Sequence, residues 1–458
     1  MMPGVDLQKP AASVPALDVE RPVVWPPRVQ RTLPNGLHVV LVESHTIPKF
    51  DAQIIFRSGN AAAVSEIPAL AEMTAAVVRT GTETRAQKQI EESLRRMGAD
   101  LGTHGNADSS AISFSGLSEF SAGLLELAAD LARNASFPPP EFERERRQRL
   151  EELRIQRTTP GFLAGERLRQ VLFGAHPYGV VAPTEEQVAA YRREQLIGYY
   201  RKHYVPGNAL FIAVGDFSAE RMMEQVERAF GSWPPATRDE PPYPPLPEIR
   251  GRRVHLVHLP GTDQAQVLLG NRAITRRHPD WLALGLANAI FGGAFNSRLV
   301  MNIREQKGYT YSPRSSVYPL RHHGFFTVHA AVRNAVTAAT LTEMFYELDR
   351  MRALPVSDDE LADTKHYLTG VFSLGLATQD GLAGQLATVY LNDLPEDYLE
   401  TYREKIRALT VGDVLTAARN YFDSPNAQIV IVGERAQVES QAALFGAVEV
   451  RDPQGNVL

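Results

Sequence analysis

The chain has 458 residues, of which 44 % are hydrophobic and 22 % are charged. This balance is typical of globular domains and excludes a disordered chain, a collagen and a coiled-coil rod. The 48 basic and 53 acidic residues give a formal net charge of −5, which excludes the electrostatic footprint of a nucleic-acid-binding protein and a polybasic membrane anchor. No apolar run approaches the roughly 18 residues that a membrane helix needs.

The N-terminal segment, residues 1–29, contains six prolines and no apolar stretch of the kind that an export signal carries. We therefore expect a flexible leader there. The chain has no cysteine, which excludes disulfides, thiolate nucleophiles and cysteine-ligated metals. This composition suits either the cytoplasm or the bacterial periplasm, and we favour the periplasm slightly, for the case that an export signal has been removed.

The first half of the chain has the pattern of an α+β domain. Short apolar runs predict strands at residues 39–43 and 52–57, and an amphipathic helix follows at about 67–79. A second helix, alternating strands that include 111–116, and a long amphipathic helix at 118–134 complete the pattern.

A proline-rich connector lies near the middle of the chain. Seven of the 14 residues from 234 to 247 are proline, and such a run continues neither a helix nor a central strand. We place a linker at 234–250, between a first domain at 30–233 and a second at 251–447.

The second domain repeats the first in the order of its elements. Asn208-Ala and Asn426-Ala, 218 positions apart, are each followed by a short apolar run that ends in Val-Gly and an acidic residue. The remaining elements of the second half are strands at 254–259, 265–271 and 325–332, and helices at 279–291 and 335–353. Internal duplication predicts two homologous α+β domains, each a mainly antiparallel sheet covered by helices.

The strand at 52–59, the first helix and the Gly-Thr after it resemble the opening of the pitrilysin/insulinase-type zinc peptidases, the inverzincins, which include the mitochondrial processing peptidase and its bacterial relatives. The resemblance covers about residues 30–445. Besides the first strands and helix and the Gly-Thr that follows them, five segments resemble family motifs in the family's order. These are 142–152 (a glutamate-rich ligand helix), 173–179 (His-Pro-Tyr-Gly), 204–216 (Tyr-x-Pro-x-Asn), 291–299 (a glycine-rich segment) and 304–311 (Arg-Glu-x-x-Gly-x-x-Tyr).

The zinc motif of the family is missing from the first helix. Active members carry His-x-x-Glu-His, in which two histidines one helical turn apart hold Zn²⁺ and the glutamate acts as general base. The corresponding positions here are Glu72, Ala75 and Ala76, while the distal ligand position, Glu152, keeps its carboxylate. We therefore expect no metal in this chain.

Other metal sites are less favoured than a plain structural role. Glu72, Glu145 and Glu152 would suit a harder ion such as Mg²⁺ or Ca²⁺, but a solvated helix with i,i+4 pairs such as Glu145–Arg149 explains the last two better. The pairs His255/His258 and His322/His323 lie on a strand and in a turn, and we interpret them as ordinary polar residues.

By contrast, Arg304 and Tyr311 match the family's motif. The resemblance implies that this pair reaches an active site and contacts the substrate, since a guanidinium and a phenol donate hydrogen bonds to a carbonyl and to the oxyanion that develops on it. Without the motif, a helix-end salt bridge and a strand aromatic would explain both. Gly292 and Gly293 are candidates for substrate binding through close approach of a peptide backbone, and a plain helix-ending turn explains them equally well.

The resemblance as a whole implies the metal-free partner subunit of a two-subunit peptidase. A homologous subunit with His-x-x-Glu-His would supply zinc, water and general base. This chain would supply Arg304 and Tyr311 in trans and part of the peptide-binding chamber, and would be inactive alone. The alternative is a scaffold without catalysis, similar to the core subunits of respiratory complexes, although a scaffold has no evident need for both residues. The missing histidines exclude an active homodimeric peptidase.

Overall fold

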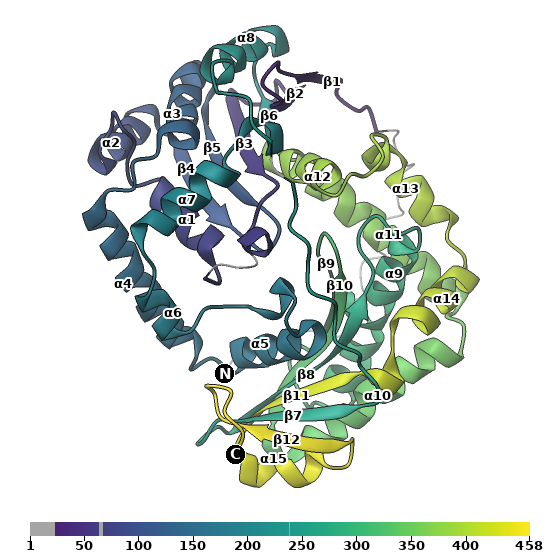
Figure 1. Cartoon of the computed structure of the whole chain (residues 1–458). Coiled ribbons are helices and arrows are strands. Elements are labelled where there is room, and N and C mark those ends of the chain that lie inside the picture. Colours follow the sequence, from purple (N-terminus) through teal and green to yellow (C-terminus); the bar gives the residue numbers. More distant parts are fainter. Residues whose placement is uncertain (1–22, 64–66, 238) are drawn as a thin grey trace, which may run out of the picture.

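A computed structural model describes residues 23–63, 67–237 and 239–458. Two six-stranded sheets form the centres of the two halves of the molecule (Figure 1). Most of the expected leader, residues 1–22, lies outside the described residues, and residues 28 and 29 belong to the first strand. Among the described residues, no helix has both the length and the apolar character needed to cross a bilayer.

The first sheet has the strand order β1-β2-β6-β3-β5-β4. Its strands are β1 (Arg28–Thr32), β2 (His38–Glu43), β3 (Lys49–Phe56), β4 (Asp100–Gly105), β5 (Ser110–Leu117) and β6 (Ala209–Gly215). Only β2 and β6 pair in parallel, so the sheet is mainly antiparallel. β4 forms one edge.

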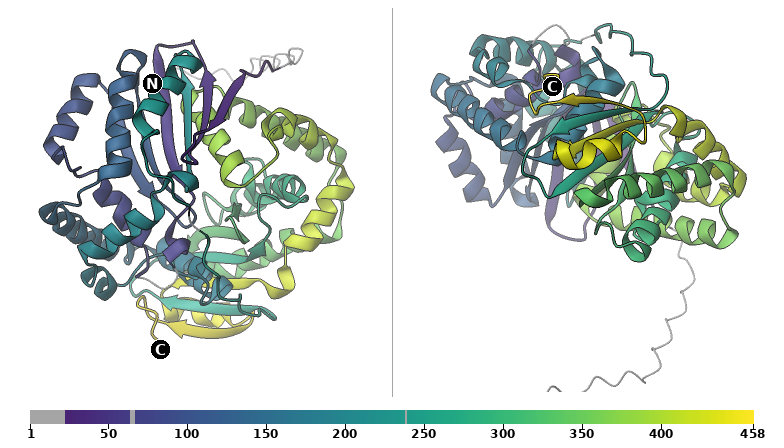
Figure 2. Two further views of the ribbon diagram at one scale, coloured as in Figure 1. Left: turned by 45° about the horizontal axis from the view of Figure 1, so that its top comes forward. Right: turned by 90° about the horizontal axis from the view of Figure 1, so that it is seen from below.

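The second sheet has the order β12-β7-β11-β8-β10-β9, which repeats the first for five of its six strands. At the remaining edge, β12 pairs with β7 in parallel, whereas β1 pairs with β2 antiparallel. Its strands are β7 (Arg253–His258), β8 (Gln264–Ala273), β9 (Arg314–Pro319), β10 (Gly324–Arg333), β11 (Gln428–Gly433) and β12 (Ala447–Arg451). β9 takes the edge position that β4 has in the first sheet, and β12 lies at the opposite edge (Figure 2). The Asn-Ala repeat leads into β6 and β11, which occupy matching places, so the predicted duplication and α+β class are confirmed.

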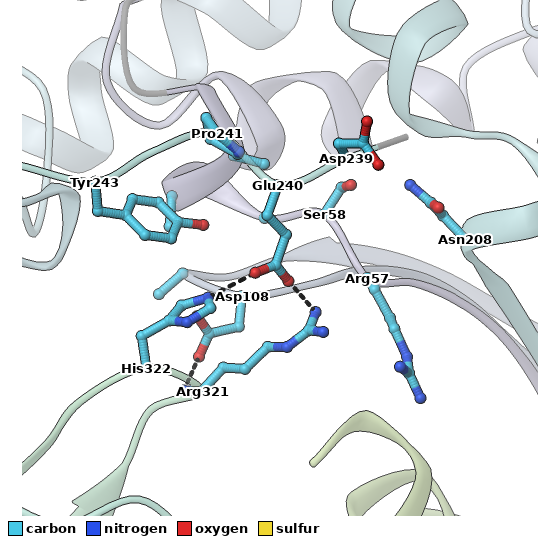
Figure 3. Close-up of a pocket in the computed structure, with 14 residues that line it drawn as sticks. Arg57, Ser58, Asp108, Asn208, Asp239, Glu240, Pro241, Tyr243, Arg321 and His322 are labelled. Carbon is cyan, nitrogen blue, oxygen red and sulfur yellow. Dashed lines mark hydrogen bonds and ion pairs between the residues drawn. The ribbon is translucent and has the colours of Figure 1, made fainter. Parts of the chain in front are cut away.

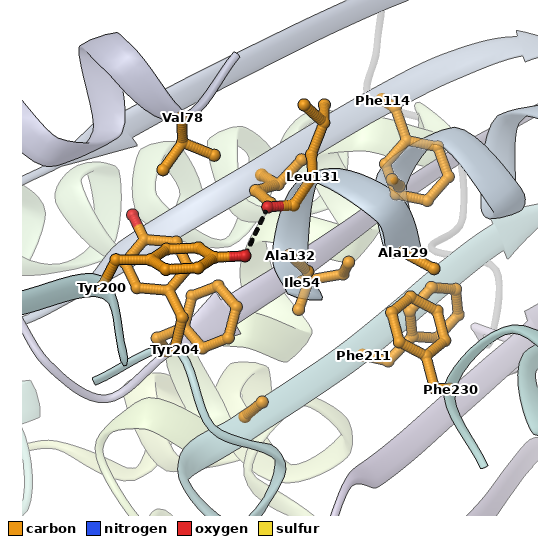
Figure 4. Close-up of a cluster of buried hydrophobic side chains, with 14 of the residues drawn as sticks. Ile54, Val78, Phe114, Ala129, Leu131, Ala132, Tyr200, Tyr204, Phe211 and Phe230 are labelled. Atoms are coloured by element: carbon orange, nitrogen blue, oxygen red, sulfur yellow. Dashed lines mark hydrogen bonds between the residues drawn. The ribbon is translucent and has the colours of Figure 1, made fainter. Parts of the chain in front are cut away.

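Helices cover the outer face of each sheet. The helices of the first half are α1 (Leu70–Val78), α2 (Gln87–Met97), α3 (Ser121–Asn134), α4 (Pro139–Gln156), α5 (Pro160–Phe173), α6 (Glu185–Ala189), α7 (Arg193–His203) and α8 (Ala219–Phe230). Of these, α5 does not cover the first sheet but packs on the second. A core of aromatic and aliphatic side chains fills the space between sheet and helices (Figure 4). The Tyr200 hydroxyl is buried there and donates a hydrogen bond of 3.0 Å to the carbonyl of Leu131, so that the core leaves this polar group satisfied.

The helices of the second half are α9 (Trp281–Asn288), α10 (Thr337–Ala353), α11 (Asp358–Gly375), α12 (Gln379–Leu391), α13 (Tyr398–Ala408), α14 (Val411–Tyr421) and α15 (Arg435–Ala442). The helix expected at 279–291 is α9 with a π-helical continuation, η5 (Ala289–Gly293). A second π-helical segment, η6 (Val300–Gln306), carries Arg304.

Each half lends one helix to the other half's sheet. Leu163, Leu168 and Leu172 of α5 pack on Leu268 and Val430 of the second sheet. In the same way, α12 packs on the first sheet through the side chains of Leu382, Ala383, Leu386 and Ala387, against Val40, Val42, Ile55, Leu210, Ile212 and Val214. Both sheets therefore turn one face toward the centre of the molecule, where a helix of the opposite half covers part of it (Figure 1).

Candidate functional site

Three of the degenerate zinc positions, Glu72, Ala75 and Ala76, lie on α1. Glu72 and Ala76 are one turn apart and partly exposed, whereas Ala75 is buried with 1 % of its surface accessible. The Glu72 carboxylate accepts a hydrogen bond of 2.8 Å from the side chain of Asn60. Burial raises the pKa of Glu72, and Arg149 and the bond from Asn60 oppose that rise.

A guanidinium occupies the space between the two remaining carboxylates. Arg149 of α4 lies 3.3 Å from Glu72 (Nη2 to Oε2) and 3.7 Å from Glu152 (Nη1 to Oε2). The expected i,i+4 pair of Glu145 with Arg149 is replaced, since Glu145 pairs with the adjacent Arg144 at 2.9 Å. Arg149 thus supplies to two carboxylates the positive charge that a metal would supply.

This donor set does not fit zinc. A tetrahedral zinc site needs three or four nitrogen, sulfur or oxygen ligands around one point. Here two ligand positions hold carboxylates with a cation already between them, and Ala76 offers no donor. Within the described ranges, no cluster of three or more His, Asp or Glu side chains has the geometry to hold a metal ion.

The histidines outside α1 have local roles. His255 lies within reach of Glu449 (3.1 Å) and Gln428 (3.3 Å), and the buried His176 accepts a hydrogen bond from the Tyr178 backbone amide. His322 forms an ion pair of 3.4 Å with Glu240. None of these sets has the arrangement of a metal site within the described residues, and the interpretation of His255, His258, His322 and His323 as ordinary polar residues stays a prediction.

A small polar cavity lies where the connector meets both halves (Figure 3). Glu240 of the connector pairs with the Arg321 guanidinium at 2.8 Å and with His322. The Arg321 backbone amide donates to the Asp108 carboxylate at 3.0 Å. The cavity holds about 20 Å³, room for little more than one water. The cavity is therefore too small for a peptide, and the polar contacts around it join the proline-rich connector to the second half and the second half to the first. Sequence reasoning missed it, because the pairing of 240 with 321 is non-local.

Arg304 and Tyr311 come together in the structure. The guanidinium carbon of Arg304 lies 4.4 Å from the ring centre of Tyr311 and 5.2 Å from that of Phe295. Such stacking holds a cation by attraction to the ring faces. Arg304 also contacts Glu305 at 3.1 Å. Phe295, inside the glycine-rich segment, was not singled out from the sequence, although its large exposed ring is the unusual residue of that segment.

This aromatic cluster is open to solvent. Tyr311 is 78 % exposed and Phe295 is 68 % exposed, which is unusual for rings of this size in a folded protein. Tyr311 lies three residues before β9, the edge strand of the second sheet. The cluster therefore presents hydrogen-bond donors and aromatic surface next to an open strand edge.

Gly292 and Gly293 allow close packing inside the glycine-rich segment. A Cβ on Gly292 would lie 2.7 Å from Ser315 Oγ and 2.9 Å from the Ser315 backbone nitrogen, and one on Gly293 would lie 2.6 Å from the Asn288 side chain. The absence of a side chain at 292 lets η5 pack directly on β9. Both glycines thus have a packing role, and their contact with substrate stays a prediction.

The family comparisons agree with this arrangement. The sequence profile of the insulinase family (peptidase family M16) matches residues 38–179, and the profile of the peptidase M16 inactive domain matches residues 190–368. An uncharacterized zinc protease of Streptomyces coelicolor is 25 % identical over 399 residues, which cover 85 % of this chain and 86 % of the relative. An uncharacterized zinc protease of Bacillus subtilis is 24 % identical over 347 residues, covering 75 % and 83 %.

Solved structures share the fold over nearly their whole length. The peptidase M16 inactive domain from Pseudomonas fluorescens superposes with a TM-score of 0.81 at 27 % identity, over 89 % of this chain and 98 % of that one. A protease from Helicobacter pylori superposes with a TM-score of 0.83 at 21 % identity, over 89 % and 100 %, and shares the fold. With both sheets, the motif order and the two matching profiles in agreement, this chain belongs to the insulinase family of peptidases, family M16.

Proposed function

We propose that this protein is the metal-free subunit of a two-subunit peptidase and contributes Arg304 and Tyr311 to peptide cleavage by a homologous, zinc-binding partner. The observation that carries the proposal is the contrast between two sites of one chain. The zinc positions are closed by an internal ion pair through Arg149. The Arg304–Tyr311 pair is clustered and exposed.

The chemistry assigned to this chain is stabilisation of charge on the substrate. Arg304 presents a permanent positive charge, and its stacking between Tyr311 and Phe295 limits the directions in which its N–H groups point. The guanidinium and the Tyr311 hydroxyl would donate to the oxygen of the scissile carbonyl as negative charge develops on it. Zinc, the attacking water and the general base would belong to the partner.

The open strand edges support binding of an extended peptide. β4 and β9 end their sheets, and each is paired on one side only. A peptide that adds to such an edge gains main-chain hydrogen bonds without a sequence requirement. Because β9 follows Tyr311 closely, a peptide on this edge would lie next to the aromatic cluster.

The test is cleavage by the assembled complex. Full-length chain would be mixed with the His-x-x-Glu-His-bearing partner, and hydrolysis of a fluorogenic peptide would be followed for wild type, Arg304→Ala and Tyr311→Phe. We expect each change to lower kcat by about 10²–10³, which is the usual effect of losing one oxyanion donor. Assembly, measured by size-exclusion chromatography, should be unaffected. Tyr311→Phe is the sharper variant, since it removes the hydroxyl and keeps the ring that holds Arg304.

Matched controls come from the same half. Tyr346→Phe changes an exposed tyrosine of α10, and Arg435→Ala removes a surface arginine paired with Glu439 on α15. Both should cleave at the wild-type rate. If Arg304→Ala and Tyr311→Phe also cleave at that rate in the assembled complex, the trans-acting role is wrong, and a scaffold role without catalysis takes its place.

A further inference from the structure

A cavity of about 330 Å³ lies on the inner face of the second sheet, beside the edge strand β9. Helix α5 packs on β7, β11 and β8 and stops short of the sheet's edge. The strands β10 and β9 therefore keep part of their inner face open. The cavity is bounded by this open face and by the flank of α5.

The register of β9 and β10 divides the open face into two ends. Tyr318 pairs with Phe325, and their rings stack with centres 4.6 Å apart. Arg314 pairs with His329 on the same face, four residues away along each strand. At about 3.3 Å per residue the two ends are roughly 13 Å apart. One end is aromatic, with the guanidinium carbon of Arg169 5.8 Å from the ring centre of Phe325, and the other end carries Arg314 and His329.

The end with Arg314 and His329 has unused hydrogen-bonding capacity. Arg314 is exposed and, among the described residues, forms no ion pair. The Nδ1 atom of His329 is buried and has no hydrogen-bond partner within the described part of the chain. A carboxylate at this end of the cavity would accept hydrogen bonds from the exposed Arg314 guanidinium, and a small turn of the buried His329 ring would give its Nδ1 atom a partner as well.

Helix α5 has glycine at two positions that line the cavity. Gly161 and Gly165 are one turn apart on α5, both line the cavity, and a Cβ added to either would meet no atom within 4 Å. Glycine within a helix is less favourable than alanine, and no atom of the described residues lies close enough to either position to require it. The free space fits a group from another molecule.

We propose that this cavity selects the peptide that adds to β9, through a large apolar side chain over Tyr318 and Phe325 and an acidic side chain at Arg314 and His329, four residues apart. The inference rests on the proposed function, since it names the substrate class of a peptide-binding chain. Residues four apart in an added strand point to the same face and span the same distance as the two ends. Residues three apart point to opposite faces.

Three fluorescein-labelled decapeptides with a Ser/Thr background test the spacing and the charge. The first carries Phe and Glu four positions apart, the second carries them three apart, and the third replaces Glu by Lys at the four-residue spacing. Fluorescence anisotropy with the isolated full-length chain should give a Kd for the first peptide at least about tenfold lower than for the other two, since a charge-assisted hydrogen bond is lost in each.

Variants assign the preference to the cavity. Arg314→Glu should reverse the order of the Glu and Lys peptides. Gly165→Leu should fill the cavity and weaken the first peptide about tenfold or more. The control Gly198→Leu, an exposed glycine of α7 whose Cβ would also meet nothing within 4 Å, should leave binding unchanged. Melting temperatures would confirm that all variants fold.

Equal binding of the three peptides, or no binding of any, overturns the inference, as does an Arg314→Glu variant with an unchanged order. The two proposals fail separately. If spacing has no effect on binding but Arg304→Ala slows cleavage by the complex, the cavity assignment alone is wrong. If spacing matters but the Arg304 and Tyr311 variants cleave normally, the chain binds peptides without taking part in their cleavage.

Discussion

Acid should destabilise this protein through His176, the histidine of the His-Pro-Tyr-Gly loop. Its ring is fully buried and packs against Tyr178 and His323, with centres 4.6 and 5.4 Å away. Burial lowers the pKa of His176 to about 4, and the charges of His323, His322 and Arg169 act in the same direction. The native state therefore holds this imidazole neutral, whereas the unfolded chain protonates it near pH 6.5.

The magnitude follows from the difference between the two pKa values. Above pH 6.5 His176 is neutral in both states and has no effect on the pH dependence. As the pH falls below 6.5, the unfolded chain takes up a proton that the native state excludes, so the free energy of unfolding falls by about 1.4 kcal/mol per pH unit until pH 4. The loss is about 2 kcal/mol at pH 5 and about 3 kcal/mol in full.

Urea unfolding of wild type and His176→Asn at pH 7.5 and pH 5.0 measures this contribution. Asparagine keeps an acceptor for the Tyr178 amide and does not titrate. The variant should be less stable at pH 7.5, because it leaves a gap in the packing, and should lose about 2 kcal/mol less than wild type between the two pH values. Other buried histidines, such as His329 with its pKa near 4, contribute equally to both proteins. Equal losses would refute the assignment to His176.

Three further predictions concern metal, charge and packing. Dialysed protein should retain no stoichiometric zinc by elemental analysis, and a chelator should leave its Tm unchanged; one equivalent per chain would contradict this. Arg149→Met should cost about 1–2 kcal/mol, between the values for exposed and buried pairs, and adding Glu72→Gln should restore most of it in a urea double-mutant cycle. Gly292→Ala should cost about 1–3 kcal/mol, because its Cβ meets the Ser315 backbone, whereas Gly285→Ala in open space should gain up to about 1 kcal/mol by thermal unfolding.

Local patterns predicted the elements and their duplication well. The Asn-Ala repeats at 208 and 426 lead into the matching strands β6 and β11, because a short run of branched apolar residues between turn signals has few alternatives to a buried strand. The start of the first helix was placed too early, at 67. Ala69 has φ of 60°, so the chain turns there and α1 begins at Leu70.

Contacts between segments that lie far apart in the chain could not be predicted from the sequence. Helices α5 and α12 each pack on the sheet of the opposite half. An amphipathic pattern shows that one face of a helix is buried, but it does not show against which sheet. Arg149 is a similar case, since its sequence neighbours suggested Glu145 as partner, whereas α4 packs on α1 and brings it to Glu72. The sequence did place positions 72, 75 and 76 together on one helix, because helical spacing is a local property.

Arg149 accounts for the polar contact between α1 and α4 at the degenerate zinc positions. In an active member a metal ion would link α1 to α4 and balance the charge of its carboxylate ligand. Here Arg149 of α4 pairs with Glu72 of α1 and so connects the two helices directly. Its second contact, with Glu152, lies within α4. The Arg149–Glu72 pair holds α1 against α4, so that the position of α1 on the sheet depends on a charge contact between two helices as well as on its apolar face.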